Sequence, residues 1–219
     1  MASQTIYGRR PVAEAERGRR RVHRIWRMPE TSAEELERLC SSPDHQGVVA
    51  EVDPYPYADS RGLLRREGAL LVALDQVQDP RNLGAVCRSA EFAGVGGVVI
   101  PERRSADVTP VACKTSAGAV EHLEVARVRN LTDWLAEAKE AGFWIWGTDA
   151  GASAAPWDVD LTGSAILVLG GEEKGIRPRV ASSCDGMVAL PRLGAVESLN
   201  VSAAASALLS EAVRQRHKP

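Results

Sequence analysis

Three polar side chains, Glu197, Ser198 and Asn200, stand at the start of a strongly apolar segment near the C-terminus. Apolar residues recur from Val201 to Val213 with the i, i+3, i+4, i+7 spacing of an amphipathic helix. Either Ser198 or Asn200 suffices as an N-cap, because one side-chain oxygen accepts a hydrogen bond from the free N–H groups of the first turn. The other polar residue is then a candidate for binding or catalysis.

Two earlier segments also place polar residues or glycines just after a predicted strand. In LDQVQDPRN the chain leads into a predicted helix, and LVLGGEEKG ends in two glycines and an acid; the residues singled out are Asn82, Arg88, Gly170, Gly171 and Glu172. Taken singly, Asn82 is typical of a helix cap, Arg88 of a surface residue paired with Glu91, and Glu172 of a solvated loop acid. Their joint occurrence at successive strand ends favours one shared site.

Strands and helices alternate in the prediction for the larger part of the chain. Strands are predicted at 69–75, 97–101, 124–128, 143–148, 165–169 and 186–190, and helices at 82–93, about 107–114, 131–141, about 178–183 and in the C-terminal segment. This order predicts an α/β fold, with a parallel sheet covered by helices on both faces. In such sheets ligands bind beyond the carboxyl ends of the strands, which is where the polar segments lie.

The segment before this alternation is distinct in composition. A short strand is predicted at 48–53, and PYPYADSRG after it reads as a linker. Residues 1–27 hold eight arginines against two glutamates, so this segment carries +6 and the remainder −8 of the net charge of −2. Such a run is commonly a solvated helix face, but guanidinium groups also suit phosphate binding. The candidate phosphate contacts are Arg9, Arg10, Arg19, Arg20 and Arg21.

Several function classes are disfavoured by composition and motifs. No apolar run is long enough to span a bilayer, and the N-terminus has no secretory or lipidation signal, so we expect a cytoplasmic protein. The four cysteines and four histidines are scattered, so no metal site is expected. No G-x-G-x-x-G follows a predicted strand, and GGEEKG lacks the spacing of a phosphate loop, which makes NAD and ATP unsuitable ligands.

Three segments together resemble motifs of the SpoU/TrmH family of RNA ribose 2′-O-methyltransferases, which belongs to the SPOUT class. They are NLGAVCRSAEFAGV, LVLGGEEKG and LPRLGAVESLNVSAAASALLSEAVRQR, in the family's order and spacing across residues 69–216. The segments YGRRPVAEA, HQGVVAEV and VTPVACKTSAGAVEHLEVARVRNL look like the branch that modifies a guanosine ribose of 23S rRNA.

The resemblance implies a parallel sheet with a trefoil knot, S-adenosylmethionine held by the C-terminal loops, and a homodimer whose interface completes the site. It assigns cofactor contacts to Gly170, Gly171, Leu190 and Leu199. It assigns the catalytic centre to Arg88, surrounded by Asn82, Glu172, Ser198 and Asn200.

Methyl transfer to a ribose hydroxyl is an in-line displacement, so positioning and removal of the hydroxyl proton should dominate catalysis. Arginine normally keeps its proton and only donates hydrogen bonds. Our preferred interpretation is that Arg88 holds phosphate and ribose while the RNA's own phosphate helps to take the proton. Arg88 as the base is the alternative.

Members of this branch usually carry a complete small RNA-binding α/β domain, for which the N-terminal segment looks too short. We therefore predict an abbreviated RNA-binding domain with its linker at 1–60 and a methyltransferase domain at 61–219. The predicted activity is methylation of a ribose 2′-hydroxyl in structured RNA, with 23S rRNA favoured. The alternatives are a tRNA 2′-O-methyltransferase and a non-catalytic RNA-binding or assembly protein that retains the cofactor fold.

Overall fold

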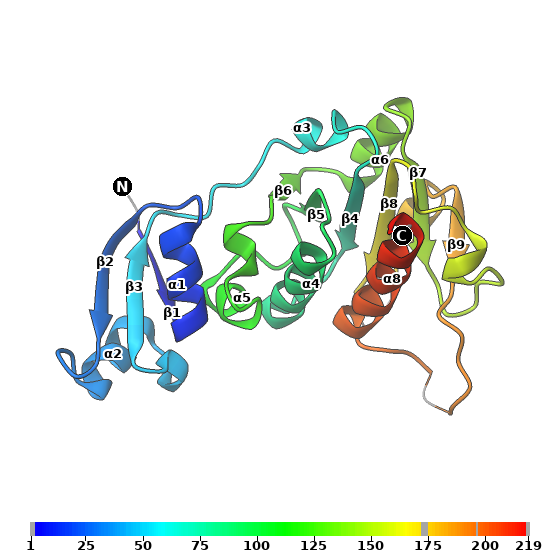
Figure 1. The fold of residues 1–219 in the computed structure, drawn as a ribbon. Helices are drawn as coiled ribbons and strands as arrows, with labels where there is room; N and C mark the ends of the chain where they lie inside the picture. The colour runs from blue at the N-terminus through cyan, green and yellow to red at the C-terminus, as the bar shows by residue number, and fades with distance from the viewer. Residues whose placement is uncertain (1–2, 172–174, 196, 218–219) are drawn as a thin grey trace.

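The main sheet consists of six strands, of which the three central ones, β5, β4 and β8, are buried on both faces. The computed structural model describes residues 3–171, 175–195 and 197–217 (Figure 1). The strands lie in the order β6-β5-β4-β8-β7-β9, and every pairing between them is parallel. Their bounds are β4 Leu70–Asp75, β5 Gly97–Pro101, β6 Val125–Val128, β7 Trp144–Thr148, β8 Ala165–Gly170 and β9 Gly186–Val188.

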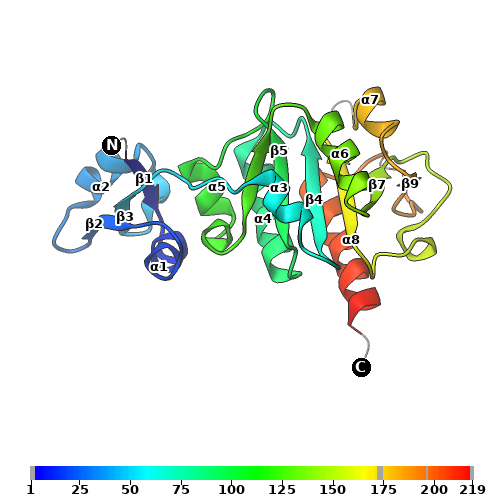
Figure 2. The same cartoon turned by 90° about the horizontal axis from the view of Figure 1, so that it is seen from above.

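Successive side chains of β4 alternate between the two faces of the sheet, as the two-residue period of a strand requires. Leu70, Val72 and Leu74 belong to one apolar core, whereas Leu71 and Ala73 belong to the other. The first core is closed by α4 Pro80–Phe92, α5 Pro110–Thr115 and α8 Val201–Arg216, and the second by α3 Ser60–Leu64, α6 Leu131–Glu140 and α7 Pro178–Ala181. Figure 2 shows these helices on opposite sides of the sheet.

The N-terminal part forms a separate small sheet beside the main one (Figure 1). Its three antiparallel strands lie in the order β1-β3-β2. The elements are β1 Gln4–Tyr7, α1 Arg9–Arg17, β2 Val22–Arg27, α2 Ala33–Cys40, the 3₁₀ turn η1 Pro43–His45 and β3 Val48–Val52. Two further 3₁₀ turns, η2 Ala119–Glu121 and η3 Pro156–Asp158, lie in the larger part.

A buried ion pair joins the small sheet to the large one. Arg20, which is 4% exposed, donates to the carboxylate of Glu121, which is 1% exposed, and it also bonds Gln4 and the Cys113 sulfur. The Tyr55 hydroxyl donates to the Leu123 carbonyl at 2.7 Å. Burial alone would lower the pKa of the Arg20 guanidinium, but its hydrogen bond to Glu121 and its interactions with Cys113 and the Glu121 charge together outweigh burial and raise that pKa.

The predicted fold class is confirmed: the sheet is parallel and has helices on both faces. Each strand and helix predicted between residues 69 and 216 is present, with ends that differ by a few residues. The N-terminal part contains more regular structure than the single strand predicted there. Both the division of the chain at residue 60 and the abbreviation of the first domain stay predictions.

Candidate active site

A cavity of about 620 Å³ opens at the carboxyl ends of β7, β8 and β9. Its walls come from the residues just after those strands and from the segment that leads into α8. They include Thr148, Gly170, Gly171, Leu190, Ser198, Leu199 and Val201. The structure thus brings together all four residues to which the family resemblance assigned cofactor contacts, and adds Ser198. The walls are mainly backbone, glycine and aliphatic side chains, which suit an organic ligand of moderate size.

Gly170 occupies a position that no larger residue fits. A Cβ atom at residue 170 would lie 2.0 Å from the carbonyl carbon of Gly175, so the backbone after β8 passes directly over the strand end. At Gly171 a Cβ atom would lie 2.6 Å from the backbone oxygen of Gln76. The two glycines therefore permit the close backbone approaches that shape this side of the cavity.

Asp75 was not among the predicted site residues, but it fixes the backbone on this side of the cavity. It ends β4, is fully buried, and accepts hydrogen bonds from the backbone N–H and the Nε of Arg177, each at 2.8 Å. The Gly171 N–H in turn donates to the Asp75 carbonyl at 2.9 Å. The sequence does contain a signal for this residue: LLVALD ends an otherwise apolar strand in an acid, and a buried carboxylate needs hydrogen-bond partners.

The two polar residues before α8, Ser198 and Asn200, have different roles. Asn200 is the N-cap, with its side-chain oxygen accepting from the Ser202 N–H at 2.8 Å. Its Nδ2 also donates to Oδ1 of Asn82 at 3.1 Å, which ties the start of α8 to the first turn of α4. Ser198 instead lines the cavity. Asn82 is not the cap of α4, because Asp79 fills that role by accepting from the Arg81 N–H.

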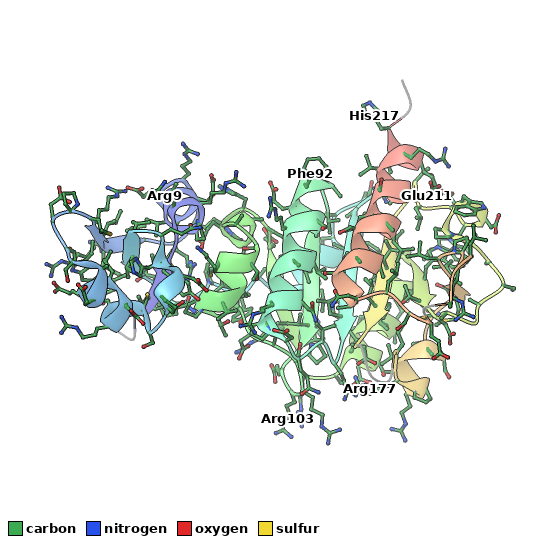
Figure 3. The ribbon with its side chains drawn as sticks, turned by 90° about the horizontal axis from the view of Figure 1, so that it is seen from below. Arg9, Phe92, Arg103, Arg177, Glu211 and His217 are labelled. Atoms are coloured by element: carbon green, nitrogen blue, oxygen red, sulfur yellow. The ribbon has the colours of Figure 1, made fainter. Side chains whose placement is uncertain are left out.

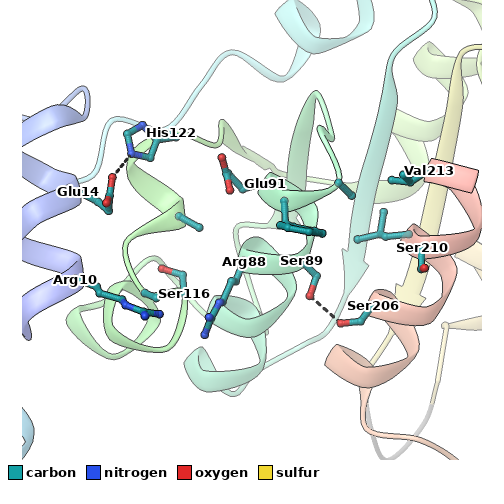
Figure 4. Close-up of a pocket in the computed structure, with 15 residues that line it drawn as sticks. Arg10, Glu14, Arg88, Ser89, Glu91, Ser116, His122, Ser206, Ser210 and Val213 are labelled. Atoms are coloured by element: carbon teal, nitrogen blue, oxygen red, sulfur yellow. Dashed lines mark hydrogen bonds and ion pairs between the residues drawn. The ribbon is translucent and has the colours of Figure 1, made fainter. Parts of the chain in front are cut away.

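Arg88 lies in a different cavity, of about 850 Å³, on the other side of α8 (Figure 4). Arg10 and Arg88 are both directed into it, from α1 and α4, and Ser89 meets Ser206 of α8 at 2.7 Å. The cofactor cavity is lined by Val201, Ala204 and Leu208 of α8, whereas the Arg88 cavity is lined by Ser206, Leu209, Ser210 and Val213. Within one chain, α8 separates Arg88 from the residues assigned to the cofactor.

Of the five arginines predicted as phosphate contacts, four are exposed: Arg9, Arg10, Arg19 and Arg21. Arg20 is not, because it is buried against Glu121, which corrects the expectation that it contributes to an RNA-binding surface. Arg19 donates to the Leu123 carbonyl at 2.6 Å, so part of its guanidinium also serves the contact between the two sheets.

Glu172, the remaining predicted site residue, lies outside the described residues. Among the residues that the structure does describe, no group of three histidine, cysteine or acidic side chains is placed to hold a metal ion. Across the same residues, no helix is both long and apolar enough to cross a membrane.

The fold and the cavity define an α/β protein with a ligand site at the carboxyl edge of a parallel sheet. Comparison with known families matches residues 69–210 to the SpoU rRNA methylase family, and residues 27–58 to a domain described as RNA 2′-O ribose methyltransferase substrate binding. The chain belongs to the SpoU rRNA methylase family.

Relatives and solved structures agree with this assignment. An uncharacterized tRNA/rRNA methyltransferase of Mycobacterium tuberculosis is 46% identical over 84% of this chain, which spans 59% of that relative's length. The SpoU methyltransferase AviRb of Streptomyces viridochromogenes, solved with AdoMet, has a TM-score of 0.84 and is 28% identical. The match covers 98% of this chain and 90% of the AviRb chain. The TrmH/SpoU tRNA-modifying enzyme of A. aeolicus has a TM-score of 0.63 and is 30% identical, over 72% of this chain and 80% of its own.

Proposed function

We propose that this chain transfers a methyl group from S-adenosylmethionine to a ribose 2′-hydroxyl of RNA, most favourably a guanosine of 23S rRNA. The main observation behind this proposal is the cavity at the carboxyl ends of β8 and β9, which is lined by Gly170, Leu190, Ser198 and Leu199. Membership of the SpoU rRNA methylase family supports the RNA substrate.

The residues present fit this cofactor. The cavity volume of about 620 Å³ lies in the range of pockets for nucleoside-sized ligands. Close backbone passage at Gly170 and Gly171 brings peptide N–H and C=O groups to the cavity wall, where they can recognise an adenine and an amino-acid group. Aliphatic side chains at Leu190 and Leu199 can cover the ring faces. When bound, S-adenosylmethionine supplies an electrophilic methyl group.

Catalysis also requires the ribose hydroxyl to be held in line with that group and to lose its proton. Arg88 suits the first task, because its guanidinium is exposed in the cavity that Arg10 also lines, and a guanidinium can bind two oxygens of one phosphate. We propose that Arg88 positions the phosphate and ribose while the RNA phosphate helps to accept the proton. Asn82, Asn200 and Ser198 then orient groups at the mouth of the cavity, and Glu172 is proposed as a fifth member of this set.

We further propose that the working form is a homodimer. Arg88 and the cofactor cavity lie on opposite sides of α8, so one chain alone does not join them. The exposed surface of α8 around Ala203, Ser206 and Ala207 is made of small side chains, and Phe92 of α4 is 91% exposed nearby. Such a surface permits close helix packing in a two-fold dimer, through which Arg88 of one chain can serve the cavity of the other. A trefoil knot around the β8–α8 region and a cytoplasmic location belong to the same proposal.

Transfer of labelled methyl from S-adenosylmethionine to purified 23S rRNA and to bulk tRNA tests the activity. Mapping of alkali-resistant phosphodiester positions then names the modified nucleotide. A resistant site in 23S rRNA is the expected result, and one confined to tRNA would move the substrate to the alternative class. Cofactor and RNA binding without transfer to either RNA would instead favour a non-catalytic binding protein.

The role of Arg88 has its own test. We expect Arg88→Ala to abolish transfer while S-adenosylmethionine affinity, measured by calorimetry, stays unchanged. Arg88→Lys keeps the charge but loses the planar fork, so partial loss is expected. Full turnover in Arg88→Ala would show that the catalytic centre is assigned wrongly.

A further inference from the structure

A second groove, of about 1170 Å³, opens at the carboxyl ends of β4, β5 and β6. Among the described residues, seven arginines line it, against two acidic side chains, Asp133 and Glu137. They come from four separate parts of the chain: the start of α3, the loop after β5, the end of β6 and the start of α7. None of them is among the arginines of the N-terminal segment. The fold therefore gathers positive charge here that is dispersed in the sequence.

Three of these arginines have carboxylate partners among the described residues, and the other four have none there. Arg61 pairs with Glu137, Arg127 with Asp107 and Arg177 with Asp75. Within the described part of the chain, no ion pair is formed by Arg103, Arg104, Arg129 or Arg179. All four are exposed. Unpaired, exposed guanidinium groups around one groove repel one another, which favours an anionic ligand.

The backbone of the loop after β5 is also unusual. Arg104 has φ 58, in the left-handed region that arginine seldom adopts, and Gln76, which lines the same groove, has φ 61. Figure 3 shows Arg103 and Arg177 projecting from the same edge of the molecule, opposite Phe92 and His217.

The groove and the cofactor cavity share one edge of the sheet. The groove covers the ends of β6, β5 and β4, and the cavity covers the ends of β8, β7 and β9, in the order in which the strands lie. They meet where β4 pairs with β8, at which point Gln76 lines the groove and Gly171 lines the cavity. A polymer with one nucleotide at the cavity can therefore continue directly into the groove.

We infer that this arginine groove binds the phosphodiester backbone of the RNA that flanks the methylated nucleotide. The inference rests on the proposed function, because an RNA substrate supplies the anion. Phosphate is the matching ligand, since a guanidinium binds two of its oxygens and successive phosphates repeat along the strand. The groove then sets the direction in which the RNA strand runs away from the methylated nucleotide, and it does so independently of the N-terminal segment.

The test compares two triple variants of the full chain. Arg103→Gln, Arg104→Gln and Arg129→Gln remove three charges from the groove. Arg65→Gln, Arg66→Gln and Arg214→Gln remove three charges from exposed positions outside both the groove and the N-terminal segment. Binding of purified 23S rRNA and of bulk tRNA is measured at several potassium chloride concentrations, together with S-adenosylmethionine binding and methyl transfer.

We expect the groove variant to bind RNA at least tenfold more weakly at low salt. The slope of log K against log salt should fall by about 2, because each lost phosphate contact removes roughly 0.7–0.9. Cofactor affinity should stay at the wild-type value, and the KM for RNA should rise more than kcat falls. The control variant should keep most of the affinity and slope.

Equal RNA affinity and slope in the groove variant, the control and the wild type would overturn the inference while leaving the proposed activity intact. A wild-type protein that binds neither RNA would remove both. RNA binding is measured separately from methyl transfer. The binding data therefore decide the role of the groove even if the wild-type protein binds RNA but transfers no methyl group.

Discussion

At the residue scale, Asp75 links the sheet to the cofactor cavity. Its carboxylate is fully buried and accepts two hydrogen bonds from Arg177, whose own side chain is 42% exposed. We expect Asp75→Ala to lower the free energy of unfolding by about 1–3 kcal/mol, because the partner donors lose their acceptor. It should also weaken S-adenosylmethionine binding. Urea denaturation and calorimetry measure the two effects.

A matched control is Asp107→Ala, which removes an exposed partner from Arg127. An exposed pair of this kind contributes at most about 1 kcal/mol, and this one lies away from the cofactor cavity. Equal effects of the two substitutions would contradict a special role for Asp75.

Gly170 is the second residue whose effect follows from geometry. A methyl group there would meet the Gly175 backbone at 2.0 Å, so Gly170→Ala must displace the loop that closes the cavity. We expect at least a tenfold loss in S-adenosylmethionine affinity. Gly163→Ala is the control, because a Cβ atom at Gly163 meets nothing within 4 Å. Unchanged cofactor affinity in Gly170→Ala would mean that the ligand binds elsewhere.

At the element scale, α8 begins at Asn200, which serves as both cap and bridge. Its side chain caps the helix through Ser202 and reaches Asn82 at the start of α4. Asn200→Ala should cost about 1 kcal/mol of stability, whereas serine keeps a capping oxygen but is too short to reach α4. We therefore expect Asn200→Ser to retain stability in urea denaturation and to reduce methyl transfer. Full transfer in the serine variant would limit Asn200 to capping.

The elements that could be predicted are those in which local pattern and final position agree. Apolar runs such as LLVALD and AILVL are buried in the sheet, and the apolar period of α8 continues to its last turn. The predicted start of α4, at Asn82, is two residues later than the observed start. Asp79 is the cap and Pro80 begins the first turn, whereas the sequence had suggested this place for Asn82. Charge gave a less reliable guide, since nothing in GRRRVHR distinguishes the buried Arg20 from its exposed neighbours. Its burial depends on Glu121, a hundred residues away.

At the scale of the whole molecule, the Arg20–Glu121 pair fixes the small sheet against the large one. Both side chains are almost fully buried, so removing one leaves the other as an unpaired charge. Arg20→Ala should lower the free energy of unfolding by about 3–5 kcal/mol. The exposed pair of Arg17 and Glu14 provides a control, in which Arg17→Ala should cost less than about 1 kcal/mol. Urea denaturation measures both, and a small loss in Arg20→Ala would mean that the two sheets are held mainly by other contacts.

The proposed dimer makes a prediction that no single chain can satisfy. Arg88→Ala should be inactive alone, because it lacks the residue that holds the substrate. Gly170→Ala should transfer little methyl at limiting S-adenosylmethionine, because its cofactor cavity is damaged. If Arg88 of one chain serves the cavity of its partner, a heterodimer of the two variants contains one intact composite site. Mixing the variants under conditions of subunit exchange should then restore about one quarter of wild-type transfer, since random pairing makes half of the dimers mixed. If Arg88 instead serves the cavity of its own chain, every site in the mixture carries a defect and transfer stays at the level of the single variants.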